Sequence, residues 1–398
     1  MIIREHYLER IRPFYESDLI KVITGIRRCG KSVLMEQIEG ELRRAGKRTL
    51  KLNFEERATQ AAYGTAEALE SYVASCLEAS GEKLYVFLDE VQLVSQWNIA
   101  CRSLRLKNLS LFVTGSNAKL LAREFTRELS GRYVAFRVYP FVYRELSEYA
   151  GQLGRSYTVS DYLVTGGFPK VVEFASRKDR LAYLNDLDAT IVINDILNRY
   201  KIRKDVLFQK LANFVFLSNA RIFSAASVQK TLKGQGLTCS INTIMKYIGY
   251  LEQAYAIETI PQFSSQAKRE LRYFRKLYNA DVSLNSIRQT APRWDYTHNL
   301  ENVVYNELIY RDYEVSVFVK DGREIDFLAQ KDGREYLIQV AYSIRESETY
   351  EREFALFAEL DQSRRKIVIT ADEEDYSTST VLHLNLEKFL LSQYLPSA

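Results

Sequence analysis

The sequence predicts an α/β protein that begins with a parallel sheet and continues into helical and mixed parts. Two observations support this prediction. A glycine-rich loop, residues 25–32, stands between a β-branched run at 19–24 and an apolar-faced segment at 33–38, which is the order strand, loop, helix. A second apolar run, at 84–90, ends in two acids, as expected for a buried parallel strand with carboxylates at its carboxyl end.

The composition is that of a globular protein with more than one domain. The chain has 398 residues, of which 46% are hydrophobic and 27% charged. The N-terminus lacks the apolar core of a signal peptide, and no apolar run approaches the roughly 18 residues of a membrane span. The net charge is +4, so any nucleic-acid surface must be local. Four scattered cysteines without a CxxC pair suit a reducing compartment, and we expect a cytoplasmic protein with no membrane contact.

The glycine loop reads G-x-x-x-x-G-K-S, which is a phosphate-binding pattern when a strand precedes it and a helix follows. The glycines let backbone N–H groups point at phosphate oxygens, and the start of the helix adds more N–H groups. Lys31 is expected to reach the β- and γ-phosphates, and Ser32 to hold Mg²⁺. The alternative is a plain glycine turn before a helix. The predicted cofactor-binding residues are Gly25, Ile26, Arg27, Arg28, Cys29, Gly30, Lys31 and Ser32.

The acids after the second apolar run complete the predicted site, because ligands bind at the carboxyl edge of open α/β sheets. Asp89 is expected to organise Mg²⁺ and Glu90 to orient or activate the attacking water; two solvated acids are the alternative. A third apolar run, at 109–114, leads to Asn117, which either bonds the γ-phosphate or the water or belongs to a β-turn. Arg132 either touches a γ-phosphate, in its own or a neighbouring subunit, or forms a surface salt bridge.

These motifs resemble those of a large prokaryotic family of AAA-type ATPases. The resemblance rests on GIRRCGKS, LYVFLDEVQ, LFVTGSNAKLL and SGRYVAFRVYPFVYREL, and its motifs fall within residues 20–150. It implies a P-loop NTPase sheet with ATP and Mg²⁺ as cofactors. It also implies a lysine and serine in the Walker A loop, two acids in Walker B, a sensor asparagine and an arginine in an S-G-R element. The corresponding residues are Lys31, Ser32, Asp89, Glu90, Asn117 and Arg132.

The middle of the chain is predicted to be helical. Residues 151–203 are expected to form an extension or lid over the nucleotide, with a G-G-F-P turn like that of the family at 166–169 and a long helix at 180–199. Residues 204–263 have the order of a winged helix, three helices followed by a strand. The predicted elements of this module are helices at 208–218, 224–232 and 240–254 and a strand at 257–260.

The winged-helix-like module is a candidate DNA-binding element. Its third helix is expected to turn Met245 inward and to expose polar residues such as Asn242 and Lys246, a weakly basic face. A protein-contact or spacer role is the alternative. The stretch 268–276 is the best local basic patch, and it is either a phosphate-binding strand or an edge strand protected by charge.

In the last part of the chain, 264–398, a helix is expected to open at Glu301, followed by strands at 314–319, 324–329 and 336–341 and, after another helix, a strand at 366–370. This order resembles a restriction-endonuclease-like core. In that architecture a helix glutamate, a strand aspartate and an E-x-K element gather a metal. Glu301, at the opening of a helix, and Asp326, on a strand, fit the first two positions. The third element reads Gln339-Val340-Ala341, without the carboxylate or the lysine. Two nearby lysines, Lys320 and Lys331, lack the strand alternation that would aim them at Asp326. The resemblance therefore implies a nuclease-like fold that does not cleave DNA.

We therefore expect four parts: an ATPase core at 1–150, a lid at 151–203, a winged-helix-like module at 204–263 and a nuclease-like domain at 264–398. The expected reaction is hydrolysis of ATP to ADP and phosphate with Mg²⁺, and the nucleotide state would control binding of DNA or protein by the C-terminal region. One alternative is a signalling or chaperone-like NTPase whose appended domains bind proteins only. Another is a nucleotide-binding scaffold that barely turns over. An arginine acting on a neighbour's phosphate would require a homo-oligomer.

Overall fold

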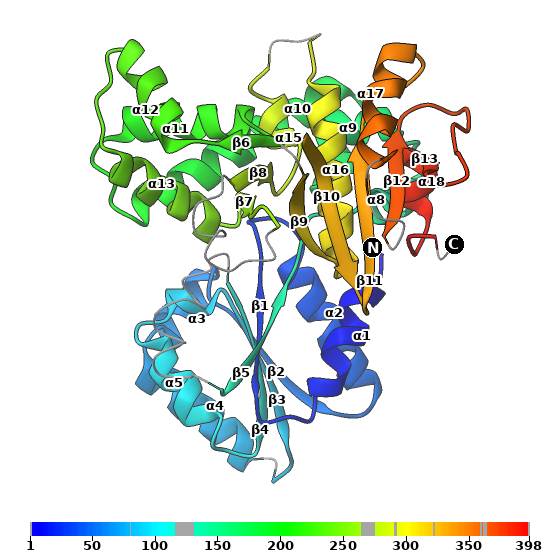
Figure 1. Cartoon of the computed structure of the whole chain (residues 1–398). Helices are drawn as coiled ribbons and strands as arrows, with labels where there is room; N and C mark the ends of the chain where they lie inside the picture. The colour runs from blue at the N-terminus through cyan, green and yellow to red at the C-terminus, as the bar shows by residue number, and fades with distance from the viewer. Residues whose placement is uncertain are drawn as a thin grey trace. The chain divides into compact units, whose positions relative to one another are not determined.

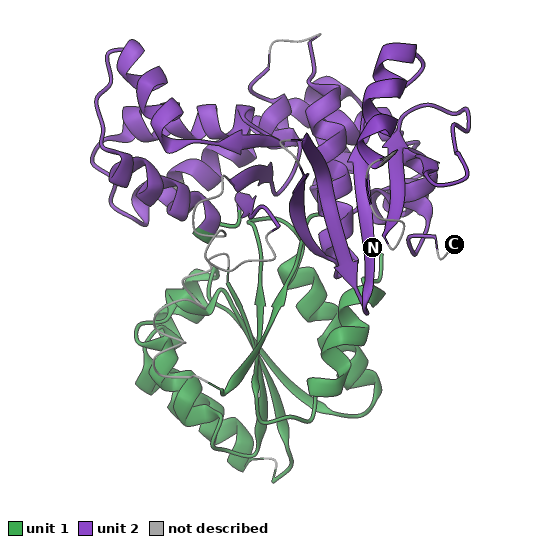
Figure 2. Cartoon of the chain, viewed as in Figure 1, with its two compact units in different colours: residues 1–140, 253–255 green, residues 141–252, 256–398 purple. Residues whose placement is uncertain are grey.

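The computed structural model describes residues 2–79, 81–115, 131–263, 275–289, 293–320, 323–358, 360 and 364–396. The chain divides into two compact units (Figure 2). Unit 1 comprises residues 1–140 and 253–255, and unit 2 comprises residues 141–252 and 256–398. None of the helices in these described ranges combines the length and apolar character needed to cross a membrane.

Unit 1 is built on the predicted parallel sheet. Its strands lie in the order β2-β3-β4-β1-β5, and every neighbouring pair is parallel. The three central strands are buried along their whole length, which explains why they read as unbroken apolar runs rather than as an alternating pattern. The strands are β1 Ile20–Thr24, β2 Arg48–Asn53, β3 Leu84–Asp89, β4 Leu109–Gly115 and β5 Tyr133–Arg137.

Helices cover both faces of this sheet. Helices α1 and α2 lie on one side, and α3, α4 and α5 lie on the other (Figure 1). Side chains of α4 and α5, with Trp97 and Leu69 among them, pack with the strands into one apolar core. Helices α3 and α5 have no counterpart among the predicted elements. The helices are α1 Glu5–Ile11, α2 Lys31–Arg44, α3 Arg57–Tyr63, α4 Ala66–Glu78 and α5 Trp97–Leu104, with 3-10 turns at Arg12–Phe14 and Val91–Leu93.

Unit 2 begins with a helical region. The helix expected at 180–199 is present as α10, which continues directly into a π-helical segment. Helix α10 begins at Ser176, whose side chain accepts a hydrogen bond from the backbone N–H of Asp179. The elements are α8 Tyr143–Gln152, α9 Val159–Thr165, a 3-10 turn at Pro169–Glu173, α10 Arg177–Thr190 and the π-helical segment Ile191–Asn198.

Three further helices and a small sheet follow. Strands β6, β7 and β8 form an antiparallel sheet in the order β6-β8-β7. One expectation for α13 is wrong: Met245 is 46% exposed, whereas Ile244, Ile248 and Leu251 are buried. Met245 follows Ile244 by one residue, which turns it about 100° around the helix and away from the buried face. The elements are α11 Asp205–Leu217, β6 Arg221–Phe223, α12 Ala225–Gly234, α13 Ile241–Gln253, β7 Ile257–Ile260 and β8 Arg275–Asn279.

The C-terminal part is a five-stranded mixed sheet in the order β13-β12-β11-β10-β9. Pairing is antiparallel from β9 to β11 and parallel from β11 to β13. The strands are β9 Glu314–Lys320, β10 Arg323–Lys331, β11 Arg334–Val340, β12 Arg365–Thr370 and β13 Leu382–Asn385. The helices of this part are α15 Ser283–Ser286, α16 Tyr296–Tyr310, α17 Ser347–Ala358 and α18 Leu386–Leu391.

The position of Glu301 also differs from the expectation. Helix α16 begins after Asp295, whose side chain caps it by accepting a hydrogen bond from the backbone N–H of His298. Glu301 therefore lies inside the helix and not at its opening. The predicted start of the helix at Glu301 is therefore more than one turn too late.

Candidate functional site

The glycine loop joins the carboxyl end of β1 to the amino end of α2. Gly25 has a φ of +146°, and a Cβ at this position would lie 2.1 Å from the carbonyl oxygen of Val138, so only glycine allows the close approach. Gly30 has a φ of +101° and ends the loop directly before α2, with no side chain capping the helix. The first N–H groups of this 14-residue helix therefore remain available to an anion such as phosphate.

Lys31 is the first residue of α2, and its side chain folds back over the loop. Its Nζ donates to the carbonyl oxygens of Gly25 and Ile26, each at 3.2 Å, and the residue is only 5% exposed. Both acceptors are uncharged, so they leave the positive charge of the ammonium group uncompensated. The loop thus presents a cation and a set of N–H donors together, which fits a polyphosphate.

A buried arginine from the start of the chain supports the loop. Arg4 is 2% exposed, and its Nη1 donates to the carbonyl oxygen of Cys29 at 3.2 Å and to that of Tyr139 at 3.0 Å. Cys29 in turn donates from Sγ to the carbonyl oxygen of Val138 at 3.3 Å. The sequence analysis missed Arg4 because nothing local to residue 4 indicates that it contacts a loop more than 20 residues away.

The two predicted acids lie at the end of β3, and Thr114 at the end of β4 holds them. The Oγ1 atom of Thr114 donates to the Asp89 carboxylate and accepts from the backbone N–H of Glu90 at 2.9 Å. Asp89 is 3% exposed, whereas Glu90, with a φ of +53°, is half-buried. The carboxylate of Glu90 also accepts a hydrogen bond from Nε2 of Gln92. Sequence reasoning missed Thr114 and Gln92, although a small polar residue at a strand end was a usable signal.

Strand order brings the loop and the acids to one edge. Strand β4 lies between β1 and β3, and the register pairs Thr24 with Gly115 and Leu88 with Val113. All three strands are parallel, so their carboxyl ends share an edge, and β1 and β3 are two strand spacings, or roughly 10 Å, apart. Phosphate donors and carboxylates therefore face the same region, as a phosphate chain with a divalent cation requires.

Of the two remaining predicted residues, Arg132 is described, and it does not lie with the loop. Asn117 lies outside the described residues. Arg132 is exposed and directly precedes β5, and its carbonyl oxygen accepts from the N–H of Ile20, the first residue of β1, at 3.0 Å. Arg132 thus stands at the amino edge of the sheet. The five residues of β5 separate it from the carboxyl edge by roughly 16 Å.

Family comparisons identify three regions. A model of an AAA domain matches residues 17–147, and models of two domains of unknown function, DUF8612 and DUF4143, match residues 156–291 and 296–389. An uncharacterized protein of Haemophilus influenzae is 33% identical over 378 residues, which is 93% of each chain. The chain belongs to the family of this protein. Its first part is an AAA-type P-loop domain, a nucleotide-binding ATPase domain that typically uses Mg²⁺.

Two other proteins are similar to this chain. The uncharacterized protein MJ1544 of Methanocaldococcus jannaschii is 28% identical over 387 residues, covering 91% of this chain and 84% of that protein. Among solved structures, the Walker-type ATPase PABY2304 of Pyrococcus abyssi aligns with 72% of this chain and 95% of its own. Its sequence identity is 14% and its TM-score 0.48.

Unit 2 contains a group of acidic side chains around one lysine, which we call the acid cluster: Glu301 of α16 and Glu324 and Asp326 of β10. The ammonium group of Lys276, on β8, lies among them, 2.7 Å from Glu301, 2.8 Å from Glu324 and 2.9 Å from Asp326. Burial alone would lower the pKa of Lys276, but the carboxylates raise it well above its usual value. Burial, together with Asp326, raises the pKa of Glu301 to about 8.

The acid cluster corrects one expectation and supplements another. Lys276 was placed in the basic patch at 268–276, yet it is 4% exposed and paired with carboxylates, so it offers no charge to a partner at the surface. Residues 268–274 of that patch lie outside the described residues. The side chain of Gln339 accepts from the backbone N–H of Asp326 at 3.2 Å. Residue 341 is an alanine, but Lys276 of β8 places an ammonium group beside Asp326.

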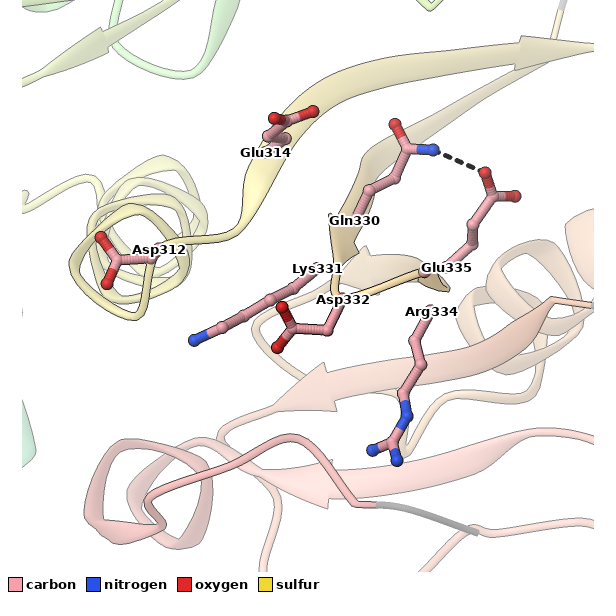
Figure 3. Close-up of a pocket in the computed structure, with 8 residues that line it drawn as sticks. Asp312, Glu314, Gln330, Lys331, Asp332, Arg334 and Glu335 are labelled. Atoms are coloured by element: carbon pink, nitrogen blue, oxygen red, sulfur yellow. Dashed lines mark hydrogen bonds between the residues drawn. The ribbon is translucent and has the colours of Figure 1, made fainter.

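A surface pocket of about 470 Å³ lies beside the hairpin between β10 and β11 (Figure 3). Some of its polar groups are already paired: Gln330 donates to Glu335 at 2.5 Å, and Lys331 donates to the carbonyl oxygen of Arg311 at 2.7 Å. Acidic and basic side chains alternate around it without a common focus, so we assign it no ligand. The lining residues are Asp312, Glu314, Gln330, Lys331, Asp332, Gly333, Arg334 and Glu335.

Proposed function

We propose that this protein hydrolyses ATP to ADP and phosphate with Mg²⁺ and uses the nucleotide state to control binding by residues 141–398. The observation that supports this most is the shared sheet edge, where the glycine loop and its uncompensated Lys31 face the acids at the end of β3. The AAA domain matched at 17–147 contains all of these residues.

Each side chain then has a defined role. The backbone of residues 25–32 holds the phosphates, and Lys31 neutralises the β- and γ-phosphates. Ser32, which is exposed at the first turn of α2, and Asp89 hold the Mg²⁺ ion. Glu90 receives the proton of the attacking water. Asn117 orients that water or the γ-phosphate. Arg132, at the far edge of its own sheet, fits the γ-phosphate of a neighbouring subunit better than its own.

Measurement of phosphate release tests this proposal. The wild-type protein should turn over ATP with Mg²⁺, and Glu90→Gln should lower kcat by about 100-fold or more while it still binds ATP, because only the proton acceptor is removed. Lys31→Ala should abolish ATP binding. Glu78→Gln, the same chemical change at the exposed end of α4, is the matched control and should retain full activity. Parental activity in Glu90→Gln, or no turnover by the wild type, would contradict the proposal.

For the C-terminal region, residues 204–398, we propose a winged-helix-like module followed by a nuclease-like domain. The order α11, β6, α12, α13, β7, β8 with its three-stranded sheet supports the first, and helix α16 with the mixed sheet supports the second. We propose that this domain does not cleave DNA, because Gln339 and Ala341 stand where a carboxylate and a lysine would be needed. Incubation with plasmid and linear DNA, with Mg²⁺ or Mn²⁺, should leave the DNA intact.

The partner of this region is DNA or protein, and one observation favours protein. The exposed face of α13 includes two apolar side chains, Ile241 at 44% and Met245 at 46% exposure, where a DNA-reading helix would present mainly polar and basic groups. Retention on DNA at several salt concentrations separates the two cases. A DNA-binding protein loses affinity steeply as salt increases, whereas we expect little retention at any salt concentration.

A further inference from the structure

The centre of the acid cluster is a position that suits a cation, and an ammonium group occupies it. Oxygen atoms of Glu301, Glu324 and Asp326 all lie within 2.9 Å of one point, which is Nζ of Lys276. Glu301 and Asp326 are less than 10% exposed, so water cannot screen their charges from one another. A neutral group at this point would leave several carboxyl groups facing one another without compensation.

The surrounding hydrogen bonds hold these carboxylates in place. Glu301 also accepts from the hydroxyl of Tyr278 at 2.7 Å, and Asp326 accepts from the backbone N–H of Val340 at 3.0 Å. Lys276 and Tyr278 are two residues apart on β8, so strand alternation places both on one face. Glu301 and Asp326 thus each have a hydrogen-bond partner other than Lys276.

We infer that Lys276 acts as a built-in cation that takes the place of a divalent metal ion in the acid cluster and joins β8 to α16 and β10. A divalent ion prefers carboxylate oxygens of this kind, but the ammonium group already fills the position. With the ammonium group in place, no three His, Cys, Asp or Glu side chains within the described ranges are arranged to hold a metal. This extends the proposal that the C-terminal domain cleaves no DNA, and it is tested separately because the readout is metal binding.

Mn²⁺ binding and thermal unfolding of the nucleotide-free, full-length protein test this inference. Mn²⁺ binding by the wild type, if there is any, should be unchanged in Asp326→Asn. Lys276→Ala should melt at a lower temperature and bind one Mn²⁺ ion. Its melting temperature should rise by about 5–10 °C at a Mn²⁺ concentration roughly 100 times Kd. The double variant Lys276→Ala with Asp326→Asn should lose this response.

Lys366 provides a matched control. It is also buried, at 7% exposure, but its Nζ donates only to the carbonyl oxygens of Phe357 and Leu360, each at 2.9 Å. Lys366→Ala should therefore destabilise the protein without creating any response to Mn²⁺. If Lys276→Ala is too unstable to purify, Lys276→Met combined with Glu301→Gln and Asp326→Asn, which removes the ammonium and two carboxylates together, should fold and ignore Mn²⁺.

Two results would overturn the inference. One is Mn²⁺ binding by the wild type that Asp326→Asn abolishes, because the cluster would then hold a metal with Lys276 present. This measurement needs no lysine variant. The other is a folded Lys276→Ala protein that gains no Mn²⁺ binding, because the position would then not be one that a metal can fill. Neither result depends on whether the protein hydrolyses ATP.

Discussion

Gln92, to which the sequence analysis assigned no role, contacts the proposed catalytic carboxylate. Its side-chain amide donates to the carboxylate of Glu90, the residue that we propose receives the proton of the attacking water. Its Oε1 atom is buried and has no hydrogen-bond partner among the described residues. Among the described residues, the hydrogen bond of this amide is therefore to Glu90. The backbone N–H of Glu90 is additionally held by Thr114.

Gln92→Ala should lower kcat for ATP hydrolysis by about tenfold, because the carboxylate keeps its charge but loses its orientation. The KM for ATP should stay within about twofold, since the phosphate loop is untouched. Steady-state kinetics separate the two parameters. A large change in KM with an unchanged kcat would instead show that Gln92 stabilises the binding site and not the proton acceptor.

Lys21 is a buried lysine in β1 and is not part of the phosphate loop. It is 0% exposed, and Nζ donates to Oγ of Ser110 at 2.7 Å and to the carbonyl oxygen of Ser17 at 3.1 Å. Burial is the main cause that lowers its pKa to about 7, and the charge of Lys83 adds to the effect. The folded protein thus favours the neutral amine at a site where the unfolded chain would carry a charge.

This difference predicts a pH dependence of stability. Between about pH 7 and pH 10.5 the unfolded chain binds a proton at Lys21 that the folded protein does not, so stability should rise with pH across this window. Relative to Lys21→Met, the free energy of unfolding of the wild type should increase by roughly 2–4 kcal/mol between pH 7 and pH 10. Urea unfolding at several pH values measures it. Lys107→Met, at an exposed lysine, should show no such trend.

At the scale of elements, the turn after α9 depends on a distant aspartate. Gly166 has a φ of +66°, and the backbone N–H of Gly167 donates to the buried carboxylate of Asp281 at 2.7 Å. Asp281 also accepts from the backbone N–H of Ser283 at 2.9 Å, which fixes its position. Gly167 in turn accepts from the N–H of Phe141 at 2.7 Å. The G-G-F-P turn therefore connects α9, the segment before α8 and the start of α15.

Gly166→Ala should destabilise the protein by about 3 kcal/mol or more, because the new Cβ would lie 1.8 Å from Oδ1 of Asp281, which its hydrogen bonds keep from moving away. Gly154→Ala is the matched control: Gly154 has the same φ of +66°, but a Cβ there meets nothing within 4 Å. It should cost only about 1–2 kcal/mol of backbone strain. Equal losses in the two variants would show that the Asp281 contact is unimportant.

At the scale of the whole molecule, the proposed ATPase residues and the acid cluster belong to different compact units. The phosphate loop and its acids lie in unit 1, and the acid cluster lies in unit 2. Unit 1 also carries Arg132 at the sheet edge opposite the phosphate loop, which makes a complete ATPase site in a single chain difficult to build. Association of several chains would supply the missing arginine.

Mixing two inactive variants tests this role of Arg132. Arg132→Ala keeps an intact phosphate loop, and Lys31→Ala keeps the arginine but binds no ATP, so each alone should have little activity. Their mixture should recover part of the wild-type rate, because one subunit supplies the arginine to the other's ATP. Arg102→Ala, at an exposed arginine of α5, should be fully active alone. Failure of the mixture to recover, with wild-type activity per chain independent of concentration, would contradict the role in a neighbour.

The sequence by itself determined the phosphate loop, the acid pair and the parallel sheet that carries them. These features are local: a loop pattern between a strand and a helix, and an apolar run that ends in acids, each depend on about ten consecutive residues. Strand boundaries followed for the same reason, and β1, β3 and β4 lie within one residue of the predicted ranges.

Only the tertiary structure decided which distant residues complete each site. Thr114 reaches the acid pair because β4 lies next to β3, and Arg132 is remote from the loop because it precedes β5 and does not follow it. The sequence placed Lys276 in a basic patch, whereas in the structure it lies in the acid cluster. It contacts Glu301 and Asp326, which are 25 and 50 residues away in the sequence. Such contacts depend on strand order and packing, which no short stretch of sequence encodes.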